Sequence, residues 1–371
     1  MLEYIGKYNK GIILADVVEE NVVSQLYNIL NNPAFENSNI TIMSDCHISS
    51  GVMVGFTMSM NKFIVPAVIG VDIGCGVSAY NLGKVTVKCE KLDNFIRMNV
   101  PSGAHTHDKS LVEPIFVRDV IKKLDIDEQY VMCSLGSLGG GNHFIELDQD
   151  EKHNIWLTIH SGSRNFGLQV AQYYQNKAKD LMKELYGGSA YHKLEYLTMD
   201  KGGQDYIDDM QTAQKYAELN RDLMAKLIIE KFYKLQFNKI EKIESIHNYI
   251  NLEDRVIRKG AISAKDGERV IIPMNRAYGC LIGTGKSGSQ YNYSAPHGAG
   301  RIMNRSDAKS KVSLEAYQKS MKGIFSTTVS KRTIDESPMV YKRPKFIIEN
   351  IQDIIDIEQT IKSIYSFKSD S

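Results

Sequence analysis

The stretch KFIVPAVIGVDIGCG, residues 62–76, contains short apolar runs rich in Val and Ile that are interrupted by Pro and Gly. That composition is typical of short strands separated by turns. GIILAD (11–16), ITIMSD (40–45) and VSAYNLGKVTVK (77–88) have the same character, so residues 11–98 are predicted to be largely extended. Within this region, residues 17–30 are predicted to form a helix.

The rest of the chain alternates between strand-like and helical patterns. IWLTIH (155–160) predicts a strand, and residues 256–282 are again strand-like. Residues 204–237 lack Pro and Gly and place Met210, Ala213 and Ala217 at helical spacing, which predicts a long amphipathic helix. Helices are also predicted over 307–323 and over the acidic segment 346–364, with a short tail at 365–371. We therefore expect a mixed α+β fold in which helices flank central β-sheets.

Composition narrows the class of protein. The 371 residues carry 45 Lys+Arg against 44 Asp+Glu, and 43% are hydrophobic, which excludes disorder, collagen and coiled coil. No linker or repeat divides the chain, so residues 1–371 are expected to form a single catalytic domain. Five dispersed cysteines do not resemble a secreted disulfide framework. Because no apolar run approaches the about 18 residues of a membrane span, we expect a cytoplasmic protein without membrane contact.

The net charge of +1 conceals an uneven distribution of charge. Residues 301–345 contain eleven Lys/Arg and four Asp/Glu, a local balance of +7, whereas residues 346–371 have a balance of −3. The basic segment begins beside His297, discussed below, and so supports an anionic partner near that residue.

Chemically versatile side chains gather at the ends of the apolar segments. Four glycines, at positions 136 and 139–141, precede Asn142 and His143; such a loop is either a turn between strands or an anion-binding backbone. Asp72 and Cys75 stand three residues apart in a tight loop. Five histidines occupy similar loop-like positions: His47, His143, His160, His247 and His297. Each alone is compatible with a hydrogen-bonded structural role, but together they indicate a site for one or two transition metals, with zinc, manganese and iron all open.

The segment SAPHGAGR (294–301) indicates a nucleophile. A neutral imidazole at His297 can attack phosphorus and form a phosphoramidate, although the same pattern also fits a local turn before a helix. Gly298, Ala299 and Gly300 would let a nucleotide pack against the backbone, and Arg301 would offset phosphate charge. Arg164, in HSGSRNFG, is a second residue suited to binding phosphate.

These motifs in this order resemble the RtcB family of RNA-splicing ligases, and in particular its compact bacterial branch. The motifs are DCH (45–47), VDIGCG (71–76), SLGGGNHFIEL (137–147), IHSGSRNFG (159–167), YIDDMQTAQKYAELNR (206–221), HN (247–248), RKGA (258–261) and HGAGR (297–301). The resemblance implies a GTP-dependent ligase with two Mn²⁺ ions that joins RNA 3′-phosphate or 2′,3′-cyclic phosphate ends to 5′-hydroxyl ends. It further implies a covalent GMP–histidine intermediate at His297 and a role in RNA repair or tRNA ligation.

The resemblance also implies a role for individual residues. Cys75 would bridge two metals, with His143 and His160 completing one site and Asp72 and His247 the other. Residues implied to bind GTP or GMP are Asn142, Phe144, Glu146, Asn248, Pro273, Asn275, Arg276, Cys280, Gly298, Ala299, Gly300, Tyr341 and Lys368. Residues implied to contact RNA or phosphate are Asp45, His47, Arg164 and Arg301.

The chain departs from the family pattern at two places. Ser49 and Ser50 stand where many members have Gly-Lys, and Cys280 stands where a serine is usual. One alternative is therefore a metal-dependent cyclic-phosphate or nucleotide hydrolase that has lost sealing. Another is a nucleotide-binding RNA module without catalysis, which the intact set of Asp, Cys and His residues disfavours. No protein partner can be named from the sequence.

Overall fold

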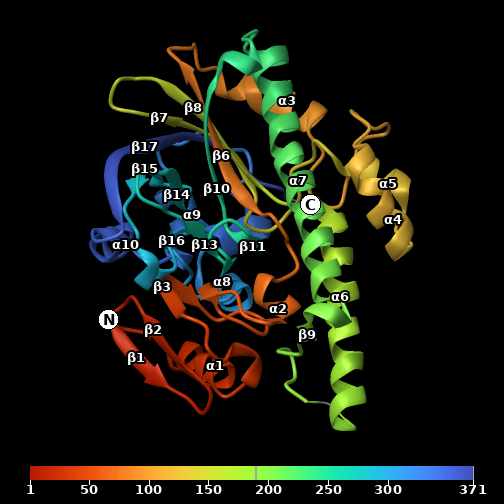
Figure 1. The fold of residues 1–371 in the computed structure, drawn as a ribbon. Coiled ribbons are helices and arrows are strands. Elements are labelled where there is room, and N and C mark those ends of the chain that lie inside the picture. Colours follow the sequence, from red (N-terminus) through yellow and green to blue (C-terminus); the bar gives the residue numbers. More distant parts are fainter. Residues whose placement is uncertain (189, 371) are drawn as a thin grey trace.

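Two large β-sheets form the centre of the computed structural model, which describes residues 1–188 and 190–370 (Figure 1). The six-stranded sheet has the order β1-β2-β3-β4-β12-β11, and the seven-stranded sheet the order β10-β6-β8-β7-β17-β15-β14. The first comprises β1 (Leu2–Ile5), β2 (Lys10–Ile13), β3 (Ile40–His47), β4 (Val54–Ser59), β12 (Val256–Lys259) and β11 (Asn248–Asn251). The second comprises β10 (Glu241–Ile246), β6 (Gly76–Gly83), β8 (Ile155–Ser161), β7 (Phe144–Gln149), β17 (Ile355–Phe367), β15 (Gly279–Gly285) and β14 (Arg269–Asn275).

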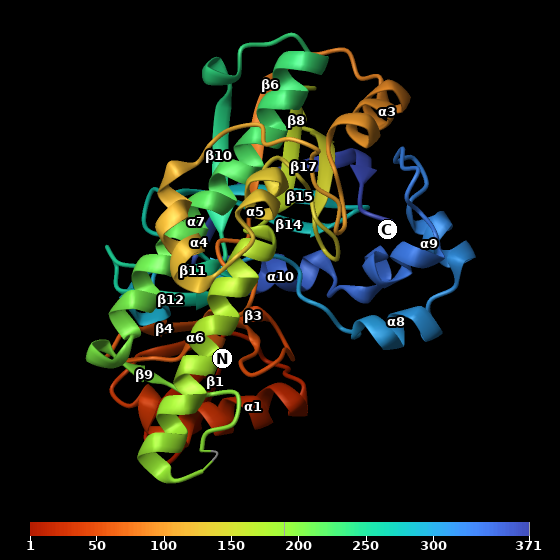
Figure 2. The ribbon, with the colours of Figure 1, turned by 90° about the vertical axis from the view of Figure 1, so that its right-hand side faces the viewer.

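Helices flank these sheets (Figure 2), and two small strand pairs complete the fold. The α-helices are α1 (Glu20–Leu30), α2 (Pro66–Ile69), α3 (Cys89–Asn99), α4 (Arg118–Leu124), α5 (Glu128–Ser134), α6 (Arg164–Tyr186), α7 (Gly203–Lys226), α8 (Arg305–Lys311), α9 (Leu314–Ser320) and α10 (Pro344–Ile351). The small pairs are β13 (Ala261–Ser263) with β16 (Ser294–Pro296) and β5 (Phe63–Ile64) with β9 (Leu197–Thr198). Helix α7 contacts β6 and β8 of one sheet and β11 of the other, so it joins the two sheets.

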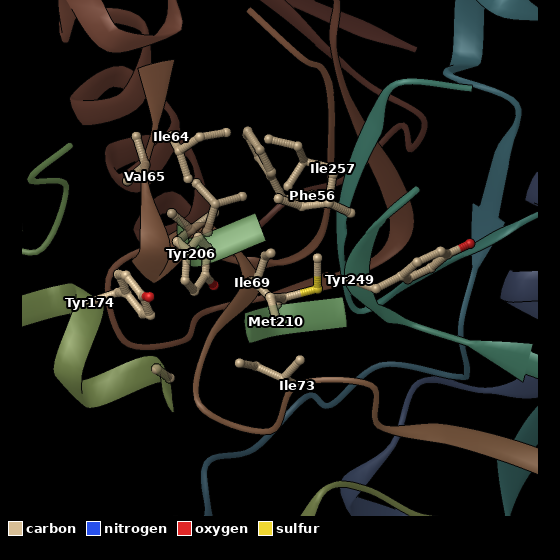
Figure 3. Close-up of a cluster of buried hydrophobic side chains, with 14 of the residues drawn as sticks. Phe56, Ile64, Val65, Ile69, Ile73, Tyr174, Tyr206, Met210, Tyr249 and Ile257 are labelled. Atoms are coloured by element: carbon tan, nitrogen blue, oxygen red, sulfur yellow. The ribbon is translucent and has the colours of Figure 1, made fainter. Parts of the chain in front are cut away.

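The largest apolar core lies between the six-stranded sheet and helices α6 and α7. Figure 3 shows Tyr206 and Met210 of α7 packed with Phe56 of β4 and Ile257 of β12. These side chains are at most 2% exposed. The buried face of α7 also includes Ala213, Ala217 and Met224, which confirms the predicted amphipathic helix.

The structure confirms the α+β class and much of the local prediction. The predicted helix over 17–30 corresponds to α1, and IWLTIH forms β8. The predicted helix over 204–237 is shorter as an α-helix, since α7 ends at Lys226 and a π-helix (Leu227–Phe232) follows. Residues 307–323 form two short helices, α8 and α9. Pro66 begins α2 inside the stretch predicted as extended, and α3, which begins at Cys89, is a second helix that was not predicted.

The C-terminal prediction was wrong in its second half. Helix α10 ends at Ile351, and residues 355–367 form β17 rather than helix and tail. Ile361 and Tyr365 are buried while Lys362 is exposed, which is the two-residue periodicity of a strand, and β-branched and aromatic residues favour that state. β17 therefore pairs with β7 on one side and with β15 on the other.

Across residues 1–188 and 190–370, no helix combines the length and apolarity needed to cross a bilayer. All five cysteines are free, as expected from their odd number and dispersed positions.

Candidate active site

Four neighbouring strands of the seven-stranded sheet bring the candidate metal ligands to one edge. β10, β6, β8 and β7 are adjacent, and their register pairs Ile246 with Gly76 and Gly76 with Ser161. His247 follows β10, Cys75 precedes β6, His160 is the penultimate residue of β8 and His143 precedes β7. Residues separated by long stretches of sequence therefore converge because they occupy equivalent ends of paired strands.

These side chains form two groups that share one thiol. Cys75 Sγ lies 3.3 Å from His160 Nε2 and 3.5 Å from His143 Nε2. His160 Nε2 is 3.3 Å from His247 Nε2, and His143 Nε2 is 3.0 Å from Asp72 Oδ2. One group capable of holding a metal is thus Cys75, His160 and His247, and the other is Asp72, Cys75 and His143. Cys75 is shared by the two groups, as expected. His143 and His160, which were expected to bind the same metal, fall in different groups.

The protonation of the cluster suits a cation. Burial lowers the pKa of both His160 and His247 well below the usual range, so each imidazole is neutral and offers a lone pair. His143 Nδ1 donates to the Leu138 carbonyl at 2.9 Å, which orients the ring so that Nε2 points toward the Asp72 carboxylate at 3.0 Å. Burial raises the pKa of the Cys75 thiol, an effect that a coordinated cation would reverse. Converging sulfur, nitrogen and oxygen acceptors therefore fit one or two divalent metal ions.

Glycines allow the ligand loops to approach one another. A Cβ built on Gly162 would overlap the Asp72 carboxylate, and one built on Gly139 would overlap the Arg164 guanidinium. Gly139 also has a φ of +87°, which L-residues rarely adopt. Gly139 of the GGG motif and Gly162 of the SGS motif are thus required by close packing around the cluster.

His297 follows β16 and lies beside the metal-capable cluster. Its Nδ1 is 2.6 Å from Asp45 Oδ2, and its backbone N–H donates to the same oxygen at 3.1 Å. Its ring centroid is 4.7 Å from that of His247. Because the carboxylate accepts a hydrogen bond from Nδ1–H, Nε2 keeps a lone pair that can act chemically as a nucleophile. Asp45, expected to contact RNA or phosphate, is instead 0% exposed and orients the imidazole.

A cavity of about 750 Å³ joins the cluster to His297 and to the region expected to bind a nucleotide. Asp72, Cys75, His160 and His247 line it, and so do all the residues expected to bind GTP except Cys280. His47 and Arg301 also line it. Asp45, His143 and Arg164 lie behind the lining; Arg164 donates to Gly103 O at 2.6 Å and to Ser137 Oγ at 3.0 Å. The expected site residues are therefore one contiguous assembly, with a few acting from behind its surface.

A sequence model described as tRNA-splicing ligase RtcB matches residues 25–132 and 119–369. The chain belongs to the RtcB family. The RNA-splicing ligase RtcB of Escherichia coli K12 is 30% identical, over 98% of this chain and 97% of that protein. The tRNA-splicing ligase RtcB of Methanococcus maripaludis is 27% identical over 92% and 89%, and that of Archaeoglobus fulgidus is 26% identical over 91% and 88%. The resemblance inferred from the motifs is confirmed.

In this RtcB-family chain, Cys280 does not reach the cavity. Its side chain is 0% exposed and packs in an apolar cluster with Trp156, Ile271 and Ile361. Burial raises the pKa of the thiol well above its ordinary value. The side chain of Cys280 therefore faces the hydrophobic side of β15 and not the cavity, so the structure gives the expected contact of its thiol with a nucleotide no support.

The end of the cavity that is expected to bind a nucleotide depends on the pairing of β17 with β7. Ser366 lies opposite Glu146 in this register and donates to Glu146 Oε1 at 2.7 Å. Lys368 Nζ donates to the carbonyls of Asn142 and His143 at 2.8 and 3.1 Å and lies 5.6 Å from the centroid of the Phe144 ring. Lys368 is 2% exposed, so the segment expected to be a tail is an ordered wall of the site.

The Asn248 side chain holds two backbone segments beside the metal-capable cluster. Its amide Nδ2 donates to the Asp72 carbonyl at 3.1 Å, and its Oδ1 accepts from Gly260 N at 3.0 Å. The side chain therefore fixes the loop that carries Asp72 as well as lining the cavity.

Glu336 is a site residue that the sequence analysis did not identify. Its carboxylate lies 2.7 Å from Arg305, 3.2 Å from Arg301 and 3.3 Å from Lys368, and it accepts from Tyr341 Oη at 2.6 Å. Burial alone would raise its pKa, but these cations hold the pKa below the usual value. In the sequence, the one sign of its role is that Asp335 and Glu336 are adjacent acidic residues inside the basic segment 301–345. Part of that segment's positive charge is consequently neutralised within the protein.

Proposed function

We propose that this RtcB-family chain is a GTP- and Mn²⁺-dependent RNA ligase that joins 3′-phosphate or 2′,3′-cyclic phosphate ends to 5′-hydroxyl ends. The observation that carries the proposal is His297, whose Nδ1 is held by Asp45 while the ring lies against the metal-capable cluster. The names of the relatives, RNA-splicing and tRNA-splicing ligase, support RNA as the substrate class and RNA repair or tRNA ligation as the setting. A cytoplasmic location and a single catalytic domain remain predictions of the sequence.

In the proposed reaction, His297 carries GMP from GTP to the RNA in successive displacements at phosphorus. Nε2 attacks the α-phosphorus of GTP, an N–P bond forms, and the P–O bond to pyrophosphate breaks. The imidazole then carries GMP and a positive charge, which the Asp45 carboxylate stabilises through Nδ1–H. An oxygen of the RNA 3′-phosphate next attacks the same phosphorus, and neutral imidazole leaves. Finally the oxygen of the 5′-hydroxyl of the second RNA end attacks the activated 3′-phosphate, the bond to GMP breaks, and the hydroxyl proton passes to water or to the departing GMP.

The two groups of ligands would hold the metal ions that this chemistry requires. Cys75, His160 and His247 would hold one, and Asp72, Cys75 and His143 the other. When bound, such ions supply neutralisation of phosphate oxygens and lower the pKa of water, including water that opens a cyclic phosphate. The donor set alone fits manganese, zinc and iron, and manganese is proposed from the family.

The lining of the cavity supports GTP as the nucleotide. A buried carboxylate at Glu146 can accept from the N1–H and N2–H donors of guanine, which adenine lacks. Phe144 and Tyr341 offer ring faces for the base, and Lys368 closes the same end. Asn142, two residues before β7, lines the same cavity as Cys75 and His160 and would contact phosphates.

The proposal is tested by incubating the protein with Mn²⁺ and α-labelled GTP and measuring acid-labile label on the protein. Wild type should become labelled and His297→Ala should not. The matched control is His105→Ala, since His105 is exposed and lies outside the cavity lining. Label that persists on His297→Ala would reject this residue as the nucleophile.

The hydrolase alternative rests on the serines at positions 49 and 50. Lys259 Nζ donates to the Ser50 carbonyl at 3.2 Å and lines the cavity, so a cation is present beside this segment. Burial lowers the pKa of Lys259 to about 8. With RNA bearing a 2′,3′-cyclic phosphate and a 5′-hydroxyl, we expect a joined product. Ring opening without joining, under conditions that attach GMP, would favour the hydrolase.

A further inference from the structure

Two consecutive residues of α7, Asn220 and Arg221, belong to the YAELNR motif and have no part in the chemistry described so far. Both side chains are 0% exposed. Successive positions on a helix point about 100° apart, so the two residues reach different segments behind the metal-capable cluster. Neither side chain lines the cavity.

Arg221 ties together the backbones that carry the thiol and the nearest imidazole. Its Nη1 donates to the carbonyls of Gly74 and Ser161, both at 2.9 Å. Gly74 precedes Cys75, and Ser161 follows His160. A single guanidinium group therefore spans the two segments whose side chains approach to 3.3 Å.

The orientation of the Arg221 guanidinium is itself fixed. Arg221 Nη2 is 3.0 Å from Glu244 Oε1, and Nε is 3.1 Å from both Glu244 Oε1 and Ser78 Oγ. Burial would raise the pKa of Glu244, but Arg221 and Lys242 lower it to about 2, so the ion pair is present at neutral pH. A lysine at position 221 would keep the charge but could not span two carbonyls and a carboxylate in this planar geometry.

Asn220 connects the glycine-rich loop to the end of β8. Its Oδ1 accepts from the N–H groups of Gly136 and Ser137 at 2.8 and 3.1 Å. Its Nδ2 lies 3.1 Å from Ser161 Oγ and 3.2 Å from the Gly162 carbonyl. The hydrogen-bond donors and acceptor of the Asn220 amide are thus used within these two segments, which carry His143 and His160.

These contacts extend to two further candidate ligands. Ser161 Oγ donates to the Leu138 carbonyl at 2.8 Å, and that same carbonyl accepts from His143 Nδ1 at 2.9 Å. Gly162 is the residue against which the Asp72 carboxylate packs. Asn220 therefore acts on the orientation of His143 and on the wall behind Asp72.

We infer that Asn220 and Arg221 are positioning residues that set the geometry of the metal centre from behind it. The inference rests on the metal centre of the proposed function. Groups that orient metal ligands typically change metal affinity by about 10- to 100-fold when they are replaced. The two side chains together hold the segments carrying Asp72, Cys75, His143 and His160.

The test uses Co²⁺ as a spectroscopic probe of the metal-free protein. Arg221→Lys and Asn220→Ala should weaken Co²⁺ binding by about 10- to 100-fold and alter the thiolate-to-cobalt absorption band. Melting temperatures of the metal-free proteins, measured in parallel, report the purely structural cost. The matched control is Arg258→Lys: Arg258 is also 0% exposed and is 2.8 Å from Asp254, but it donates to Ser294, Asn292 and Tyr293. It should lower the melting temperature while leaving Co²⁺ affinity and spectrum unchanged.

Each outcome discriminates. If Arg221→Lys and Asn220→Ala bind Co²⁺ with the affinity and spectrum of wild type, as Arg258→Lys should, the inference is overturned while the metal centre stands. If either variant does not fold, Ser161→Ala removes only the hydroxyl that links Asn220 to Leu138, and unchanged Co²⁺ binding there would also contradict the inference. Failure of wild type to bind Co²⁺ would instead reject the metal centre itself.

Discussion

Nδ1 of His297 lies 2.6 Å from Oδ2 of Asp45, a carboxylate that solvent does not reach. This contact fixes the tautomer and the direction of the imidazole, so the availability of the Nε2 lone pair depends on a residue that does not line the cavity.

Asp45→Asn should slow labelling of His297 by α-labelled GTP by about 10²- to 10⁴-fold, a range typical of a lost acid–base partner. An amide N–H in place of the carboxylate would turn Nδ1 into an acceptor and move the proton to Nε2. Single-turnover labelling measures the rate, and Co²⁺ binding serves as the control because Asp45 touches none of the candidate metal ligands. A rate equal to that of wild type would contradict the orienting role.

Stability should fall on acidification because of His47. Burial lowers its pKa to about 4, so the native state stays neutral while the unfolded chain gains a proton near pH 6.5. Because the pKa of this histidine is lower in the native state than in the unfolded chain, its contribution to the free energy of unfolding is complete above pH 6.5. It is lost progressively as the pH falls to 4. From pH 7 to pH 5, protonation of His47 in the unfolded chain should lower the free energy of unfolding by about 2 kcal/mol. Urea unfolding of wild type and His47→Gln at both pH values checks this, and equal losses would refute it.

Glu336→Gln should destabilise the protein by about 3 kcal/mol or more, because Arg301, Arg305 and Lys368 would lose their shared counter-charge. Released from Glu336, Lys368 should also support nucleotide binding less well, which raises the GTP concentration needed for half-maximal labelling. Chemical denaturation and a GTP titration measure the two effects. Glu349→Gln, which removes an exposed pair with Lys345 at 3.6 Å, should change stability by less than about 1 kcal/mol.

Cys280→Ser should reduce stability by about 1–3 kcal/mol without changing the GTP requirement, since the new hydroxyl would be buried among apolar side chains. Urea unfolding and GTP titration of the labelling reaction provide the two measurements. A changed GTP requirement at unchanged stability would restore Cys280 to the nucleotide site.

The sequence predicted the periodic elements better than the ones decided by tertiary pairing. Helix α7 has a continuous buried face, so its period is visible in the sequence alone. β17 also has a helical pattern, because Ile354, Ile357, Ile361 and Ile364 are three or four residues apart, and the choice of strand depends on pairing with β7 and β15.

The composition of the site was more predictable than its geometry. Asp72, Cys75 and the histidines could be singled out by residue type and context. Which imidazole stands near which group depends on the order of β10, β6, β8 and β7 in the sheet, which local sequence does not encode. Asp45 and Glu336 were misassigned or missed because their importance arises from partners distant in sequence.

The position of β17 imposes an order on biosynthesis. This strand occupies the fifth of seven positions in its sheet, yet residues 355–367 leave the ribosome after every other strand. Until they emerge, β7 and β15 both have open edges, and Ser366 and Lys368 cannot complete the wall of the cavity. A chain interrupted before residue 355 would therefore expose two unpaired strand edges and should be prone to aggregation.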